Sequence, residues 1–418
     1  MNIKRYLIAG LSLGMLAATF ASSSANAAPS NTGYDDNPDV VIGGGSDTTY
    51  LVQQRLDTLY NGAPGCALDV ASASTNKGKC LGAPASTGDT KGNYDHDDFV
   101  EAAAIGSGAG INALLPPAAG GVQYNPAINY ARSSRIPSST ELASTTGWGY
   151  ARDAIAVVTF GTRNANLSKD DLFKIYSCTY TTWGQIPDGA GGFQFPGDAT
   201  PIVPWDMNSA SGTRSTFVTW MGNPSFGSCV RKLSNGVAPF ENDVKPILAD
   251  SSATVSNDSN NYVWWMSYGD WKTYPYTNSG TSVSTGSLVT SNLVALTNDY
   301  TVAPAIPTAA NTNNQKYPVL RTLYLVTKNT DADCVTTPGA AGLCNNAADT
   351  VYGASGGTGG AVRQFVAWLC HPSSASHTID SVTGVDYKTE SNSAINAEGF
   401  QTVPAALRTS GYGCSVAT

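Results

Sequence analysis

Three times along this chain, a short apolar stretch leads into a turn rich in Gly, Ser and Thr and then into apolar residues at helical spacing. The three turns are GGGSDTTY (43–50), IGSGAG (105–110) and NSASGT (208–213). Each passage predicts a strand, a tight turn and a helix. Strands that alternate with helices favour an α/β architecture, in which ligands usually lie at the strand ends.

Three other segments fit the same architecture. DAIAVVTF (153–160) is an unbroken apolar run, which predicts a buried strand. NLSKDDLFKIY (166–176) places Ser168 three residues before Asp171, a capping pattern typical of a helix start. AVRQFVAWLC (361–370) carries an apolar stripe at helical spacing. These segments extend the predicted α/β alternation along most of the chain.

Length and charge narrow the class of protein. The chain has 418 residues, 41% of them hydrophobic, whereas single cores stop growing near ~250–300 residues. We therefore expect two lobes. The 23 Lys and Arg against 31 Asp and Glu give a net charge of −8, and no basic run is long enough to form a stripe. This composition argues against nucleic acid as a partner.

The first residues predict export. Lys4 and Arg5 precede an apolar stretch from Tyr6 to Phe20, and Ala25-Asn26-Ala27 has the small residues of a signal peptidase site. We expect a signal peptide over residues 1–27 that is cleaved near Ala27. No later stretch reaches the ~20 apolar residues of a membrane helix. The sequence near the cut contains no cysteine, which argues against a lipid anchor. We expect a secreted or extracytoplasmic protein.

The eight cysteines are an even number, and in an exported chain they predict disulfides. Their spacing favours the sequential order Cys66–Cys80, Cys178–Cys229, Cys334–Cys344 and Cys370–Cys414, although other pairings remain open. Zinc is a poorer explanation because the chain has no C-x-x-C and its three His are not at ligand spacing. No metal or cofactor is expected.

The three turns suggest an anion site. A helix start has unpaired backbone N–H groups and a partial positive charge, so it can hold an anion without a cationic side chain. Ser and Thr add hydroxyl donors. Several such turns that converge from two lobes would surround an oxyanion with neutral dipoles, although any one of them alone is equally a helix cap.

Other motifs offer rival functions. GSGAG lacks the full dinucleotide spacing, and no G-K-[ST] occurs. GASGG (353–357) has the letters of a hydrolase elbow around Ser355 but no clear preceding strand. YDHDD (94–98) fails the EF-hand pattern and is better explained as a solvated turn. The aromatic tract YVWWMSYGDW (262–271) would either stack on sugar rings or pack in a core.

Eight segments together resemble one known family. In chain order they are GGGSDTTY (43–50), IGSGAGI (105–111), YARSSR (130–135), DAIAVVTF (153–160), LSKDDLFKIYSCTYTTWGQI (167–186), NSASGTRSTF (208–217), YPVLRTLYLVTK (317–328) and GFQTVPAAL (399–407). This order is similar to that of the PstS-type phosphate-binding proteins of ABC transporters, in the type II periplasmic-binding-protein-like superfamily. The most specific segments are Leu167–Trp183 and Ser211-Gly212-Thr213.

The resemblance implies a two-lobed α/β fold with the ligand in the cleft between the lobes. Lobe 1 would comprise residues 28–155 and 316–418, and lobe 2 would comprise residues 156–315. Two crossing segments, near 153–162 and 315–328, would join them, and the cleft would close by a hinge motion.

The resemblance also implies a ligand set. The family's first ligand loop falls on Thr49 and Tyr50, its second on Ser107, and its third contribution on Ser211, Gly212 and Thr213. Two positions depart from the family: Met207 stands where it has Arg, and Ser134 stands where it has Asp. That Asp accepts the proton of hydrogen phosphate, so its replacement leaves the choice of anion open.

Neighbouring residues offer replacements for the two missing groups. Arg135 and Arg214 would supply the guanidinium, unless each forms a surface or interlobe salt bridge, and Asp47 would accept the proton. The complete candidate set is Asp47, Thr48, Thr49, Tyr50, Ser107, Gly108, Ser133, Ser134, Arg135, Ser211, Gly212, Thr213 and Arg214.

The expected function is capture of inorganic phosphate or a similar tetrahedral oxyanion outside the cell. The protein would act as a monomer, catalyse no reaction and deliver the ion to an ABC permease in the membrane. One alternative is a secreted carbohydrate-binding or adhesive protein that uses the aromatic tract. Another is a secreted phosphate-ester hydrolase, for which the motifs supply no convincing nucleophile and base.

Overall fold

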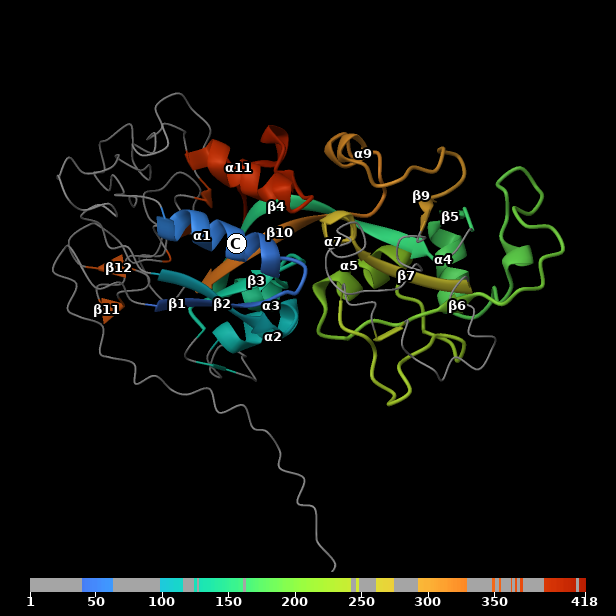
Figure 1. Ribbon diagram of the computed structural model, residues 1–418, viewed down its shortest axis with the longest axis horizontal. Helices are drawn as coiled ribbons and strands as arrows, with labels where there is room; N and C mark the ends of the chain where they lie inside the picture. The colour runs from blue at the N-terminus through green and yellow to red at the C-terminus, as the bar shows by residue number, and fades with distance from the viewer. Residues whose placement is uncertain are drawn as a thin grey trace, which may run out of the picture.

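The structure is a computed structural model (Figure 1). It describes residues 40–62, 98–115, 124–125, 128–160, 163–241, 246–247, 261–273, 292–328, 348–349, 353–354, 362, 365–366, 369–370, 387–410 and 413–418. The expected signal peptide, most of YDHDD and Ser355 lie outside these ranges. Within them, no helix combines the length and apolar character needed to cross a bilayer.

The described strands build one large sheet of mixed direction. Its main path is β2-β1-β3-β10-β4-β7-β6. The bounds are β1 Val40–Gly45, β2 Asp98–Ala104, β3 Tyr130–Ser133, β4 Thr145–Thr159, β6 Val203–Pro204, β7 Tyr262–Ser267 and β10 Leu320–Lys328. Strand β1 is parallel to β2 and β3, and β6 is parallel to β7. Strand β10 is antiparallel to β3 and β4, and β4 is antiparallel to β7.

Shorter strands complete the arrangement. Three of them pair with β4: β8 Asn292–Leu293, β13 Gln401–Thr402 and β14 Ser415–Ala417. Two separate ladders are formed by β5 Asn166–Ser168 with β9 Ala295–Thr297, and by β11 Ala348–Asp349 with β12 Gly353–Ala354.

Strand β4 connects the two halves of the molecule. Its first part, residues 145–154, pairs with β10, and its last part, residues 155–159, pairs with β7. Figure 1 shows β4 and β10 passing from the half with α1 and β1 toward the half with α5 and β7. The strand predicted over 153–160 is present, but it begins earlier, at Thr145. The sequence did not predict residues 145–152 as strand because they alternate small, aromatic and polar side chains and have no apolar run.

Each of the three Gly/Ser/Thr turns leads into a helix, as predicted. The helices are α1 Tyr50–Gly62, α2 Ser107–Leu114, α3 Ser139–Leu142, α4 Lys169–Tyr176, α5 Gly212–Met221, α7 Tyr268–Thr273, α9 Ala309–Asn313 and α11 Tyr387–Ala397, with 3-10 turns η2 Trp183–Gln185 and η4 Ala405–Leu407. At α4 the predicted capping box is confirmed: Ser168 accepts from the Asp171 amide, and the Asp171 carboxylate accepts from the Ser168 amide at 2.8 Å.

Two large cores lie on either side of the crossing strands, and a third, smaller cluster packs α2 against β3 and β10. The core of what we call lobe 2 gathers α4, α5 and β7 around the second half of β4. The core of lobe 1 gathers α1, α11, the first half of β4 and the apolar stripe predicted over 361–370, whose members Val362, Phe365, Val366 and Leu369 are buried. The fold is thus the expected two-lobed α/β arrangement. The lobe boundaries drawn from the sequence stay a prediction.

The aromatic tract belongs to the core of lobe 2. Every residue of β7 is buried, and the rings of Trp264 and Trp265 stack with centroids 5.8 Å apart. Trp265 also stacks on Phe217 of α5, at 4.8 Å. The rings of β7 therefore offer no platform for sugars. The other two aromatic residues of the tract, Tyr268 and Trp271, are partly buried and pack against the same core, with ring centroids 6.0 Å apart.

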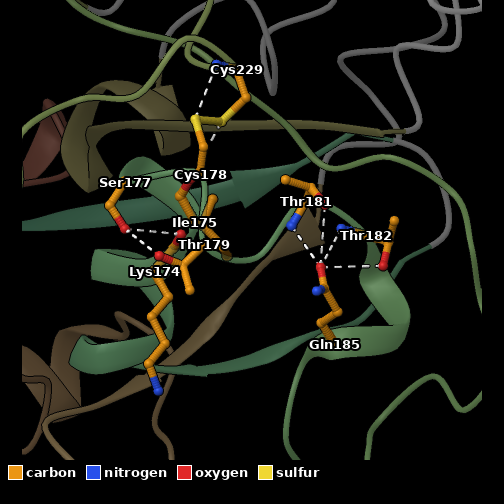
Figure 2. The surroundings of a disulfide bond; sticks show 9 residues. All are labelled: Lys174, Ile175, Ser177, Cys178, Thr179, Thr181, Thr182, Gln185 and Cys229. Atoms are coloured by element: carbon orange, nitrogen blue, oxygen red, sulfur yellow. Dashed lines mark hydrogen bonds between the residues drawn. A yellow bond between two sulfur atoms is a disulfide. The ribbon is translucent and has the colours of Figure 1, made fainter.

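Two of the four predicted disulfides are confirmed, Cys178–Cys229 and Cys370–Cys414. The other four cysteines lie outside the described residues. Figure 2 shows the first bridge directly after α4, where Cys178 also accepts a hydrogen bond from the Cys229 amide at 3.0 Å. Beside it, the Gln185 side chain accepts from the amides of Thr181 and Thr182 at 2.7 and 2.9 Å. The bridge therefore fastens the segment after α5 to the end of α4.

Candidate functional site

The turn after β1 and the start of α5 meet although 165 residues separate them. The hydroxyl oxygens of Thr48 and Thr213 lie 3.1 Å apart, and both residues are fully buried. Thr48 belongs to lobe 1 and Thr213 to lobe 2. The contact therefore places two of the three Gly/Ser/Thr turns on opposite sides of one interlobe site.

The third turn reaches the same place from lobe 1. The hydroxyl oxygen of Ser107, at the start of α2, lies 3.1 Å from that of Ser134 and accepts from the Ser134 amide at 3.0 Å. A side-chain carbon on Gly212 would collide with the Ser107 hydroxyl and lie 2.6 Å from that of Ser134. Ser107 and Ser134 therefore press directly against the N-terminus of α5, and only glycine fits between them.

Backbone contacts also bring α2 against lobe 2. The Gly108 amide donates to the carbonyl of Ala210 at 3.3 Å. Gly106 has a φ of 92°, a left-handed conformation, and a side-chain carbon there would lie 2.7 Å from the same carbonyl. Glycine adopts this conformation without strain. Gly106 is therefore required both by the shape of this turn and by the close approach of the other lobe.

At the start of α5, Ser211 is the N-cap residue. Its hydroxyl oxygen accepts from the Arg214 amide at 3.1 Å, while its hydroxyl proton is available to donate elsewhere. The Thr213 amide, in the first turn of the helix, has no partner within the helix. The start of α5 thus presents one hydroxyl and one amide donor toward lobe 1.

A buried cation lies behind the two threonines. Arg321, near the start of β10, is 4% exposed, and its guanidinium donates to the hydroxyls of Thr213 at 2.6 Å and Thr48 at 3.2 Å. Its Nε and Nη2 donate to one oxygen of Asp153 on β4 at 2.9 and 2.7 Å. Arg321 is therefore held by a buried carboxylate while it orients one hydroxyl from each lobe.

A second buried carboxylate occupies the centre of the donors. Glu241 is fully buried, and its Oε1 accepts from the Ser46 hydroxyl at 3.0 Å and from the amides of Asp47 and Thr48 at 3.0 and 3.3 Å. Its Oε2 accepts from the Ser211 hydroxyl and from the Thr213 amide at 3.3 Å. Two anionic oxygens are thus bound by five donors, three from lobe 1 and two from lobe 2.

One of the acids near Arg321 has a raised pKa. The pKa of Asp270, in α7, lies well above its ordinary value because the carboxyl is buried and because Asp47 and Asp153 are acids close by. A raised pKa favours the neutral form of this carboxyl. Across the part of the chain that the structure describes, no three His, Cys, Asp or Glu gather so as to hold a metal ion.

Several candidates from the sequence have other contacts. Arg135 forms a two-pronged ion pair with Glu141, both bonds at 2.7 Å, and Arg214 pairs with Asp206 at 2.9 Å. Neither residue supplies the guanidinium that orients the site hydroxyls, because each is paired with a carboxylate of its own lobe. Both residues form salt bridges, the alternative role considered from the sequence.

The remaining candidates lie at the edge of the site. The Thr49 hydroxyl donates to the Ser46 carbonyl at 3.5 Å, so it closes its own turn, and Thr48 is the threonine that faces lobe 2. The Tyr50 ring lies under the Arg132 guanidinium, 5.1 Å from its centroid. The Ser133 hydroxyl donates to the Arg135 carbonyl at 2.7 Å. Met207 is buried, with its sulfur 3.1 Å from the Ser211 hydroxyl.

The sequence reasoning missed Arg321, Asp153 and Glu241. Arg321 and Asp153 had a detectable signal, since each is a single charge at the edge of an apolar strand segment, where an unpaired charge would be costly. Glu241 had none, because the segment around it, NGVAPFEND (235–243), has no recognisable pattern. Its role depends on a loop that returns to the start of α5.

Comparisons with known proteins agree with this architecture. A family model described as the PBP superfamily domain matches residues 27–345. No curated protein matches the chain.

Among solved structures, the chain is similar to a putative phosphate ABC transporter substrate-binding protein with bound phosphate from Clostridium perfringens, at 14% identity and a TM-score of 0.49, with 88% of this chain and 100% of that one covered. It is also similar to PstS from Borrelia burgdorferi, at 16% identity, a TM-score of 0.41 and coverage of 88% and 100%. A phosphate-binding protein from Stenotrophomonas maltophilia matches at 17% identity, a TM-score of 0.41 and coverage of 88% and 91%. The match of the family model over most of the chain shows that this protein belongs to the PBP superfamily domain family.

Proposed function

We propose that this protein captures inorganic phosphate, or a tetrahedral oxyanion of similar size, in the site between its lobes. The observation that carries the proposal is the set of five donors from both lobes around two anionic oxygens. Ser46, Asp47 and Thr48 donate from one side, and Ser211 and Thr213 donate from the other. Donors gathered in this way from distant turns form a site for a small oxyanion.

The site has the right chemistry for an anion although the protein is acidic. The donors are neutral amides and hydroxyls, and two of them lie at or before a helix N-terminus, where the dipole favours negative charge. Arg321 is a buried positive charge that contacts the site through Thr48 and Thr213. Because the site is buried, these dipoles act at a lower effective dielectric constant than they would in water.

Additional hydroxyls suit a ligand with four oxygens. The Glu241 carboxylate has two oxygens, and the five donors form hydrogen bonds to both of them. Thr48, Thr213, Ser107 and Ser134 have further hydroxyls grouped at the start of α5. These hydroxyls can donate or accept, so they can adapt to a phosphate oxygen with or without its proton. Asp47, whose amide is one of the five donors, is our proposed acceptor for that proton.

The proposal includes a place in transport. A two-lobed protein that closes around its ligand can present it to a membrane permease without chemical change. We propose that the chain is exported, acts as a monomer and serves an ABC importer. It would therefore be a carrier and would catalyse no reaction.

Binding of anions to the purified protein tests the function. Calorimetric titration and thermal melting are measured with phosphate, arsenate, sulfate, molybdate and buffer alone, because a ligand that binds only the folded form raises the melting temperature. We expect a rise with phosphate and arsenate. Thr213→Val should abolish most of it, because valine has the same shape but lacks the hydroxyl that faces Thr48.

A matched control is Thr219→Val, the same change at an exposed position of the same helix. It should bind phosphate as the unchanged protein does. The proposed function is wrong if none of the four anions raises the melting temperature or gives a binding isotherm.

A further inference from the structure

Glu241 holds a position that the proposed ligand needs. Its carboxylate is fully buried and accepts hydrogen bonds from three residues of lobe 1 and two of lobe 2. We propose that Glu241 is an internal ligand of the oxyanion site, and that an incoming oxyanion binds by displacing its carboxylate. The inference rests on the proposed function and adds how that site is regulated.

The carboxylate and an external oxyanion cannot share the donors. Each amide and each hydroxyl has one proton to donate, and the protons of Asp47, Thr48 and Thr213 amides already point at Glu241. A second anion at the same place would also meet a like charge in a buried setting, where the repulsion is strong. Binding is therefore an exchange of one anion for another.

Glu241 is carried by lobe 2, and its loop follows α5. In this loop, the Pro239 carbonyl accepts from the Asn208 amide at 2.8 Å and the Arg231 carbonyl accepts from the Asp206 amide at 2.9 Å. The loop is therefore fixed to the segment just before α5. From this position, the bonds of Glu241 to Ser46, Asp47 and Thr48 cross to lobe 1.

The carboxylate therefore also connects the lobes without a ligand. A tetrahedral ion at the same place would accept from the same five donors and would make the same connection. The exchange thus lets the lobes stay together both with and without the ligand. It also reduces the affinity for the ion, because the Glu241 carboxylate competes for the same donors. The apparent dissociation constant rises as the fraction of protein with a vacant site falls.

Removal of the carboxylate tests the exchange. Glu241→Gln keeps the size of the side chain and removes its charge, while Glu241→Ala removes the competing group. Phosphate should bind to each variant at least about tenfold more tightly than to the unchanged protein, as measured by calorimetric titration. A tenfold difference corresponds to a Glu241 carboxylate that occupies the site in about nine of ten molecules of the unchanged protein. Glu398→Gln, which alters an acid paired with Arg55 outside the site, is the matched control and should leave the affinity unchanged.

A second measurement does not depend on any anion. Hydrogen exchange of the Asp47, Thr48 and Thr213 amides in phosphate-free buffer should be faster in Glu241→Ala, because these amides lose their acceptor. Glu241→Gln keeps one side-chain oxygen as an acceptor and should speed their exchange less. Exchange elsewhere in α1 and α5 should be unaltered, which shows that the variants are folded. Unaltered exchange at the three amides would overturn the proposed contact.

The outcomes separate this inference from the function. Equal or weaker phosphate affinity in both variants overturns the exchange and leaves phosphate capture standing; weaker affinity would mean that the carboxylate contacts the bound ion. Failure of the unchanged protein to bind any of the four anions refutes the proposed function and the exchange with it.

Discussion

Replacement of Arg321 by Met removes one partner of the buried ion pair beneath the site. Arg321 is 4% exposed and Asp153 2% exposed, and two nitrogens of the guanidinium contact a single carboxylate oxygen at 2.9 and 2.7 Å. Loss of one partner of a buried pair costs about 3–5 kcal/mol, because the other charge is left uncompensated. We expect Arg321→Met to lower the free energy of unfolding by that amount.

A double-mutant cycle separates the pair from the packing of its side chains. Asp153→Asn removes the charge of Asp153 but keeps an oxygen for the Gly269 amide, which donates to Asp153 Oδ1 at 3.2 Å. The double variant should cost less than the sum of the two single variants, by about 2 kcal/mol or more. The assay is urea unfolding at pH 7 followed by tryptophan fluorescence, with linear extrapolation to water.

An exposed ion pair provides the comparison. Lys174 and Asp170 pair along α4, with side chains 35% and 66% exposed, and Lys174→Met should cost no more than about 0.5 kcal/mol. If Arg321→Met costs as little as Lys174→Met, or if the double variant shows no coupling, the buried pair does not stabilise the folded protein. Arg321→Met should also weaken phosphate binding, since it removes the donor to both site threonines.

Three further predictions concern other parts of the molecule. Burial raises the pKa of Asp57 to about 7. Between about pH 4 and 7 the folded protein therefore retains a proton that the unfolded chain releases. Because of this, the free energy of unfolding falls by up to about 4 kcal/mol as the pH rises from about 4 to 7. Asp57→Asn should remove this contribution and make the fall of stability with pH shallower, measured by urea unfolding across that range. Replacement of Cys178 and Cys229 by Ser opens a loop with a sequence separation of 51 residues and should cost about 4 kcal/mol in the same assay. Gly212→Ala forces the Ser107 hydroxyl aside and should weaken phosphate binding by about 1–3 kcal/mol in calorimetry.

Each of these has a result that contradicts it. Stability of Asp57→Asn with the same pH slope as the unchanged protein would show that another group is responsible. An unaltered urea midpoint after loss of both cysteines would mean that the bridge adds nothing to stability. Full phosphate affinity in Gly212→Ala would mean that the lobes do not approach as closely as described.

The sequence was sufficient for features that depend on neighbours in the chain. The Ser168 and Asp171 capping box requires a spacing of three residues, and its geometry is local. The strand, turn and helix order at residues 43–50 could be predicted for the same reason, because apolar periodicity and glycine act within a few residues. The Cys178–Cys229 pair was favoured by order along the chain, but only the structure selected it among the possible pairings.

The tertiary structure alone decided which side chains form the site. Thr48 faces lobe 2 and Thr49 does not, since the direction of each side chain depends on how the turn is held against α5. Arg321 is the cation at the site because β10 and β4 place it beside Asp153, whereas Arg135 is taken by Glu141. These partners are distant in sequence, so no local pattern could reveal them. The carboxylate of Glu241 is the clearest case, because its donors come from both lobes and meet it only when the chain is folded.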